Sequence, residues 1–446
     1  MNIRNSKALI IILCIFMSIF PILHIYYAGG NTPYADEWAF IPFLNNVFTG
    51  HTSIYDWFAS HNGHRYPLLR LLMVVDAYIS SLNLKLLMYL SVVFTLCTFV
   101  LICRHYLKTV KSSIDETFSY MAIIVISALL FSLRQWENWL MGMQVAIFMM
   151  CFFVVAASYT LTQMCKSNQR WYFLILSMLF SLLATYSFGA GLLLWPIAVL
   201  YLLMRRDRSW HISLPIIYGI VGIAVIVIYS YGLANNLEIR ALISDPTHSI
   251  VYFILLLGTP VVGDVHNQPD LVMTFIIGIV MGFIYITLFV FMLRKSRQPD
   301  NIAIEFLPLL LFSVGAAFLI TLGRVGYPLV TAVSSRYSTI LILGPIAACT
   351  MLVLSRPHLS AKVKYLPNII MALLVIFVTF STIWEGAIMT KYRHAYVSNL
   401  KTILLSKSKL TDDNLHEFNW NPTIIRSDII ILQKRKWSVY SENNAK

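Results

Sequence analysis

The chain has 446 residues, of which 58% are hydrophobic and 12% are charged. Soluble domains carry about 45–50% apolar and about 25% charged residues, so a soluble enzyme, a nucleic-acid-binding domain and a disordered chain are all excluded. Long unbroken apolar runs, in place of alternating dyads, also exclude a transmembrane β-barrel. The composition therefore predicts an all-α polytopic membrane protein.

A transmembrane helix needs about 20 apolar residues. Two apolar runs, Pro67–Leu82 and Ser249–Gly263, are short and carry charged or helix-breaking residues, so we interpret them as re-entrant or interfacial helices. The runs that predict eleven crossings are Ala8–Tyr27, Leu84–Cys103, Ser119–Leu133, Gly142–Met164, Trp171–Ser187, Gly191–Met204, Ile212–Tyr231, Leu271–Leu293, Ile304–Leu322, Tyr337–Leu354 and Leu366–Trp384.

The distribution of positive charge predicts the orientation of these crossings. With a cytoplasmic N-terminus, sixteen of the 33 Lys and Arg residues lie on the cytoplasmic side and seven lie in the outer loops. The cytoplasmic clusters are Arg4–Lys7, Arg104–Lys111, Lys166–Arg170, Arg205–Arg208, Arg294–Arg297 and Arg356–Lys364. The outer cations are Arg65, Arg70, Lys85, Arg134, Arg240, Arg324 and Arg336. Each outer arginine is expected either to hold a phosphate bidentately or to pair with a nearby carboxylate.

The outer loop 29–66 contains two adjacent carboxylates, Asp36 and Glu37, at the mouth of the first crossing. One interpretation is an acidic pair in the aromatic belt of the interface, because Tyr34 and Trp38 flank it. The other is a general base that deprotonates a hydroxyl nucleophile. Like charge is expected to raise the proton affinity of the pair, and Glu37 or Asp56 is the alternative base.

The same loop ends in His61-Asn62-Gly63-His64-Arg65, a run dense in groups that hold an anion or a sugar. The two histidines lack a third ligand at motif spacing, so a phosphate pocket is favoured over a metal site. The six cysteines lie in or beside apolar runs and predict neither a disulfide framework nor a zinc site. No cofactor is expected, although a divalent cation is left open.

Two further outer turns combine aromatic and polar side chains. Trp136 and Glu137 lead into Gln144, a composition typical of a platform that binds sugar hydroxyls and ring faces. Arg324 opens another turn, which closes with Arg336 and Tyr337. The alternative for each aromatic residue is membership of the interfacial belt.

Several strings occur in an order that resembles a known superfamily: D-E-W, H-N-G-H-R, W-E-N-W with G-M-Q, S-F-G-A-G, G-R-V-G, S-S-R-Y and the ending I-L-Q-K-R-K-W-S-V-Y. Together with many crossings they resemble the GT-C glycosyltransferases that use polyprenyl-phosphate sugars. The subgroup that looks most similar is that of the bacterial and phage glucosyltransferases that modify O-antigen. The resemblance implies that Asp36 is the base, that Glu37 is its neighbour, and that the donor is a sugar on undecaprenyl phosphate.

The resemblance and the distribution of charge together predict the organisation and setting of the chain. Residues 1–384 are expected to form a GT-C-like transmembrane catalytic domain, and residues 385–446 a small helical segment on the periplasmic side. The predicted activity is inverting hexosyl transfer, of glucose, to lipopolysaccharide O-antigen or a related glycan at the bacterial inner membrane. The alternatives are a lipid-linked sugar flippase or transporter, whose sites usually lie at the bilayer midplane, and an O-antigen polymerase.

Overall fold

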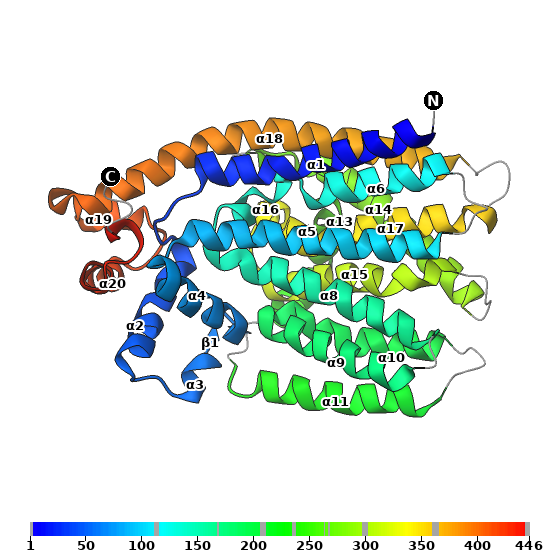
Figure 1. The fold of residues 1–446 in the computed structure, drawn as a ribbon, viewed down its shortest axis with the longest axis horizontal. Coiled ribbons are helices and arrows are strands. Elements are labelled where there is room, and N and C mark those ends of the chain that lie inside the picture. Colours follow the sequence, from blue (N-terminus) through cyan, green and yellow to red (C-terminus); the bar gives the residue numbers. More distant parts are fainter. Residues whose placement is uncertain are drawn as a thin grey trace.

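In a computed structural model, the protein forms an elongated bundle of helices (Figure 1). It describes residues 3–110, 116–166, 169–205, 211–233, 238–262, 264–265, 268–296, 302–358 and 365–441. Some predicted features lie outside these residues: Gly263 and the cations Lys111, Arg206, Arg208, Arg297, Lys362 and Lys364.

Ten helical stretches of the described chain are long and apolar enough to cross a membrane. The helices that form them are α1 (Ile3–Ala28), α5 (Leu84–Thr109), α6 (Glu116–Leu130), α8 (Val145–Met164), α9 (Arg170–Ser187), α11 (Ser213–Ser230), α14 (Leu271–Lys295), α15 (Leu307–Arg324), α16 (Ser335–Leu341) with α17 (Leu343–Ser355), and α18 (Leu366–Leu405). They coincide with ten of the eleven predicted runs. The protein is an all-α polytopic membrane protein, as the composition predicts.

The eleventh predicted run forms a shorter apolar helix, in which the 3-10 turn η4 (Gly189–Leu193) leads into α10 (Leu194–Met204). Together these two elements extend about 26 Å, close to the thickness of a bilayer core of about 30 Å. α10 packs against α11 and α15 inside the bundle. The two chain termini lie at opposite ends of the bundle, which requires an odd number of crossings (Figure 1). Ten long helices and α10 satisfy that requirement.

Short elements join the crossings at the end of the bundle that holds the C-terminus. They are η1 (Ala35–Phe40), α2 (Ile41–Thr49), α3 (Ile54–Trp57), β1 (Ser60–His61), β2 (His64–Arg65), α4 (Pro67–Ser80), η2 (Leu133–Gln135), α7 (Trp136–Trp139), η3 (Gly142–Gln144), α12 (Ile239–Ser244), α13 (Pro246–Gly258), β3 (Asp264–Val265), β4 (Gln268–Pro269), η6 (Leu329–Val333), η8 (Lys407–Lys409), α19 (Asp412–His416), α20 (Pro422–Arg435) and η9 (Ser438–Tyr440). The opposite end carries η5 (Ile302–Phe306) and η7 (Arg356–His358).

The short run at 67–82 forms α4 and stays at the C-terminal end of the bundle. Near its start, Arg70 donates two hydrogen bonds of 2.8 Å to the carbonyls of Trp57 and Ala59. Just after its end, the carbonyl of Ser81 accepts a hydrogen bond of 2.8 Å from the Ser438 amide. Both sets of hydrogen-bond partners lie at the same end of the bundle, so α4 does not cross the membrane.

The short run at 249–263 forms α13, which also begins and ends on one side. His248 lies 3.3 Å from the carbonyl oxygen of Tyr327, and Thr259 donates to the carbonyl of Ala332 at 3.1 Å. Both partners lie in the connection between α15 and α16. The sequence interpretation of these two runs as interfacial elements therefore agrees with the structure.

The segment after residue 384 begins as a continuation of α18, which runs without a break to Leu405. It then folds through α19 and α20 onto the outer loop. The Ala35 amide donates to the carbonyl of Phe418 at 2.9 Å, and Arg435 Nε donates to Asn45 Oδ1 at 3.1 Å. The first outer loop and the last helices thus share one hydrophobic cluster.

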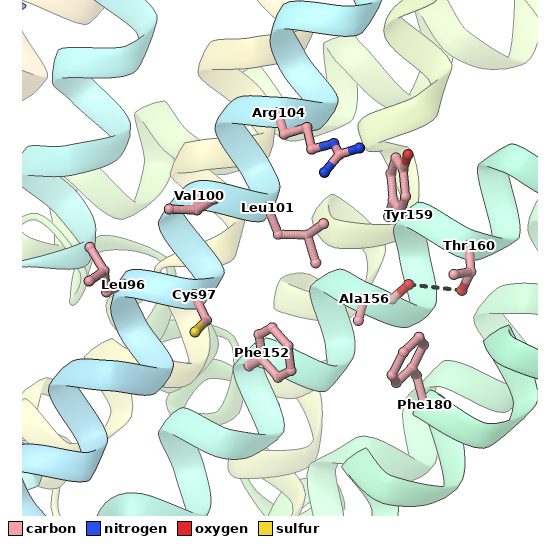
Figure 2. A pocket seen from close by; sticks show the side chains of 10 residues that line it. All are labelled: Leu96, Cys97, Val100, Leu101, Arg104, Phe152, Ala156, Tyr159, Thr160 and Phe180. Carbon is pink, nitrogen blue, oxygen red and sulfur yellow. Dashed lines mark hydrogen bonds between the residues drawn. The ribbon is translucent and has the colours of Figure 1, made fainter. Parts of the chain in front are cut away.

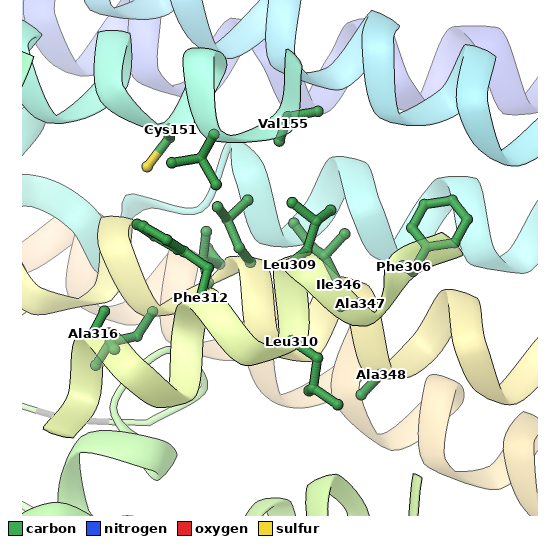
Figure 3. Close-up of a cluster of buried hydrophobic side chains, with 14 of the residues drawn as sticks. Cys151, Val155, Phe306, Leu309, Leu310, Phe312, Ala316, Ile346, Ala347 and Ala348 are labelled. Atoms are coloured by element: carbon green, nitrogen blue, oxygen red, sulfur yellow. The ribbon is translucent and has the colours of Figure 1, made fainter. Parts of the chain in front are cut away.

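The main core lies between the crossings, where α8, α15 and α17 meet (Figure 3). Phe306, Leu310 and Ile346 are almost wholly buried there. Close packing of this kind gives the bundle a rigid frame, and the short elements that carry the polar residues are attached to one end of it.

Candidate active site

Asp36 occupies η1, where the chain leaves α1 and turns toward α2. The preceding residue, Ala35, has a φ of 48°, a left-handed conformation that costs an L-residue about 1–2 kcal/mol. The hydrogen bond from Ala35 to Phe418 holds this conformation. The Asp36 side chain is 36% exposed, so it is held in place and remains open to a ligand.

Two groups of the following hairpin contact the Asp36 carboxylate. Asn62 Nδ2 donates to Oδ2 at 2.9 Å, and His61 Nε2 lies 3.6 Å from Oδ1. Burial raises the pKa of Asp36, but hydrogen bonding and charge from His61, the Asn62 amide and the charge of Arg336 outweigh it. The pKa of Asp36 is therefore below its ordinary value, and the carboxylate is ionised at neutral pH.

The hairpin presents these groups because of its two-residue turn. β1 and β2 pair antiparallel, with Ser60 opposite Arg65 and His61 opposite His64. Asn62 and Gly63 connect them with φ values of 49° and 76°. Asn-Gly with both residues in the left-handed region is the preferred tight hairpin turn, so this local sequence fixes where His61 and Asn62 lie.

His64, directly opposite His61 in the hairpin, has a different set of neighbours. Its ring stacks on Phe188 with centroids 4.4 Å apart, and a Cβ on Gly189 would lie 2.5 Å from its Nδ1. Burial lowers the pKa of His64 to about 4, so the ring is neutral at pH 7. It can form hydrogen bonds, but it does not supply a positive charge.

Glu37 does not share the environment of Asp36. It is 1% exposed, and its two oxygens accept hydrogen bonds of 3.0 Å from the amides of Tyr34 and Met143. Burial raises the pKa of Glu37 to about 7, against these hydrogen bonds and the charge of Arg393. The expectation that the two neighbours raise each other's proton affinity is wrong, because only Glu37 is raised and the cause is desolvation.

Glu137 organises the turn that carries Arg336. One of its oxygens, Oε2, accepts hydrogen bonds of 2.9 Å from the hydroxyls of Ser334 and Ser335 and from the Arg336 amide. The next residue, Asn138, donates to the Arg336 carbonyl at 2.8 Å. The strings W-E-N-W and S-S-R-Y, far apart in sequence, therefore form one unit. In that unit Glu137 is a positioning residue at the start of α16.

The outer cations separate into two groups by their partners. Arg65 is an anchor, because its three guanidinium nitrogens donate to the carbonyls of Phe58, Tyr229 and Tyr231. This geometry argues against the predicted contact between Arg65 and a phosphate. Arg134 forms a buried salt bridge of 2.8 Å to Glu385. It therefore pairs with a carboxylate, which is one of the two roles predicted for an outer arginine.

Arg324 and Arg336 form the second group. Both are exposed, and neither forms a salt bridge within the described part of the chain. Their guanidinium groups lie over the rings of Tyr327 and Tyr337, at 5.4 Å and 5.3 Å from the centroids. The charge of Arg336 reaches Asp36, and that of Arg324 reaches His64. Arg336 is therefore the available cation whose charge acts on the ionised carboxylate, and Arg324 is the one whose charge acts on His64.

The remaining residues predicted to bind the sugar or phosphate make fewer polar contacts than Glu137 and Arg65. Tyr337 is buried beneath Arg336. Trp136 is partly exposed, and its buried Nε1 has no hydrogen-bond partner among the described residues. Gln144 is partly exposed and lies 3.8 Å from the sulfur of Met141. Across the described residues, no three His, Cys, Asp or Glu side chains come together as a metal site.

The sequence interpretation missed Trp420, which the C-terminal segment brings to the site. Its ring lies 6.2 Å from that of His61, and its buried Nε1 has no partner within the described chain. Phe418, two residues earlier, packs edge-on against Trp38 at 5.6 Å. An N-terminal loop and a C-terminal loop together form the surroundings of Asp36.

No protein-family model matches the sequence, and no curated protein matches it. Among solved structures, the fold is similar to ArnT from Cupriavidus metallidurans bound to undecaprenyl phosphate, with 11% identity and a TM-score of 0.49 over 96% of this chain and 89% of that one. It is also similar to the oligosaccharyltransferase AglB from Archaeoglobus fulgidus in complex with an inhibitory peptide and a dolichol-phosphate, with 11% identity and a TM-score of 0.46 over 92% of this chain. The chain spans 60% of the length of that oligosaccharyltransferase.

Proposed function

We propose that the protein is a membrane glycosyltransferase that moves a hexose, glucose, from undecaprenyl phosphate to a cell-surface glycan. The observation that carries the proposal is the ionised, partly exposed Asp36 within electrostatic reach of Arg336, an available cation whose backbone amide is held by Glu137. A base and a phosphate-binding cation are the two groups that such a transfer requires.

The proposed reaction is a single displacement. The acceptor hydroxyl oxygen attacks the anomeric carbon and its proton passes to the Asp36 carboxylate. The bond between that carbon and the phosphate oxygen breaks, and its electron pair leaves with the phosphate, which Arg324 and Arg336 bind. Attack opposite the leaving group inverts the anomeric configuration. A phosphate is a good leaving group, so a base of low pKa is sufficient.

The setting we propose follows from charge and from the family resemblance. The cytoplasmic excess of Lys and Arg puts the N-terminus in the cytoplasm and Asp36 at the periplasmic face of the bacterial inner membrane. A lipid-linked donor in the bilayer and a lipopolysaccharide O-antigen in the periplasm meet at that face. Glu37 then supports the fold of the loop and takes no part in proton transfer.

The direct test uses the purified protein in liposomes with radiolabelled glucosyl phosphoryl undecaprenol and isolated lipopolysaccharide. The proposal expects label in the lipopolysaccharide and free undecaprenyl phosphate in equal amounts. Movement of the donor across the bilayer without transfer would favour a flippase, and lengthening of the O-antigen would favour a polymerase. Mass analysis of lipopolysaccharide from cells with and without the gene identifies the sugar and its position.

A further inference from the structure

A lateral groove of about 530 Å³ lies between α5, α8 and α9 (Figure 2). Its walls are apolar side chains such as Val100, Phe152 and Phe180, with the exposed thiol of Cys97 among them. One cation, Arg104, lies at one end of it beside the ring of Tyr159. An apolar groove with one positive charge at its end matches an amphiphile that has an apolar chain and an anionic headgroup.

The dimensions of the groove match half a bilayer. Its lining along α5 runs from Leu96 to Arg104, a rise of about 12 Å for a helix, whereas one leaflet contributes about 15 Å of hydrocarbon. α5 begins at Leu84, at the end of the bundle that carries Asp36, and ends at Thr109. The groove therefore starts near the middle of the bundle and reaches the other end, where the N-terminus lies (Figure 1).

Arg104 is available for a ligand at that end. It is exposed, and no hydrogen bond or ion pair links its guanidinium to the described part of the protein. The neighbouring His105, in contrast, is buried and lies 3.0 Å from the Glu305 carboxylate. Arg104 and His105 thus have different roles, and of these two residues only Arg104 lines the groove.

We propose that this groove binds an anionic phospholipid of the leaflet at the N-terminal end of the bundle. One acyl chain lies along the groove as far as Cys97 and Leu96, and the headgroup phosphate accepts hydrogen bonds from Arg104. Guanidinium suits a phosphate because its donors form a planar fork. The site is independent of the proposed transfer reaction, because it lies in the opposite leaflet from Asp36.

Lipid retention measured by native mass spectrometry tests the proposal. The full-length protein is equilibrated with equal amounts of phosphatidylglycerol and phosphatidylethanolamine and then released from detergent. Arg104→Gln is expected to lower the ratio of bound phosphatidylglycerol to phosphatidylethanolamine about fivefold, the effect of one cation near a membrane surface. Cys97→Phe, which fills the groove at an exposed position, is expected to reduce retention of both lipids.

Two matched variants control for general effects. Arg294→Gln removes an exposed arginine at the same end of the bundle, and Ile223→Phe adds an aromatic ring at a lipid-facing position on α11. Both should retain lipid like the unaltered protein. The proposal is overturned if Arg104→Gln keeps the original lipid ratio or if Arg294→Gln loses it equally. Preferential retention of added undecaprenyl phosphate over phosphatidylglycerol would also overturn it.

Discussion

The exchange of Asp36 for asparagine tests the proposed chemistry most directly. The variant keeps the size of the side chain and an oxygen that can accept from Asn62, whose hydrogen bond is 2.9 Å long. The proton acceptor and its negative charge are lost. Removal of a positioned base typically lowers the rate about 10²–10⁴-fold, which corresponds to about 3–5 kcal/mol in the activation free energy.

The cost to folding should be small by comparison. Asp36 is partly exposed, and its contact with His61 spans 3.6 Å. An exposed pair of this kind contributes about 0–1 kcal/mol. We therefore expect the Asp36→Asn protein to insert, to melt within a few degrees of the unaltered protein in detergent, and to transfer almost no sugar in the liposome assay.

Glu37→Gln provides the matched control. Both oxygens of Glu37 accept backbone amides, whereas a glutamine must turn its NH₂ group toward one of those donors. An unsatisfied buried group costs about 1–3 kcal/mol, so this variant should melt earlier but keep its turnover per folded molecule. Near-normal transfer by Asp36→Asn would refute the reasoning and make Asp56 the next candidate base.

Four further outcomes follow from the site. Arg336→Lys should raise the donor KM about tenfold, because a point charge replaces the planar fork; an unchanged KM would remove Arg336 from the phosphate site. Glu137→Ala should raise the donor KM and lower the melting temperature, since three donors lose their acceptor. If Glu137→Gln restores both the donor KM and the melting temperature, hydrogen bonding and not charge is what Glu137 contributes. Trp420→Ala should raise the acceptor KM about tenfold, and Trp420→Phe should retain most of the binding; an equal rise in the donor KM would contradict a role specific to the acceptor. The free energy of unfolding should fall as the pH rises from about 4.5 through about 7. The reason is that folded Glu37, with a pKa of about 7, holds its proton more tightly than unfolded glutamate. If Glu37→Gln leaves the pH dependence of the melting temperature unchanged, this assignment is wrong.

The crossings could be predicted from the sequence because they depend on local properties. Apolar length marks a helix that crosses a bilayer, whichever residues it later contacts. α10 was also predicted, although its length falls short of the others. The left-handed Asn62-Gly63 pair is another local signal, since few residues other than Asn and Gly adopt that conformation readily. These elements needed no knowledge of tertiary contacts.

The roles of the polar residues could not be predicted in the same way. Arg65 and Arg336 both lie in polar outer turns, but only the folded structure reveals that Arg65 donates to Tyr229 and that Arg336 remains available. Glu37 and Asp36 are neighbours in sequence and differ in burial because η1 turns one inward. Trp420 reaches the site only through the packing of the C-terminal helices.

The hydrogen bond between Ala35 and Phe418 joins two segments that are synthesised at different times. The loop that carries Asp36 is made before the segment around Phe418 that fixes its conformation. A nascent chain on the ribosome therefore lacks one wall around its proposed base until every crossing has been inserted. A chain released before Phe418 is made would lack this contact, so we expect it to insert in the membrane without the proposed transfer activity.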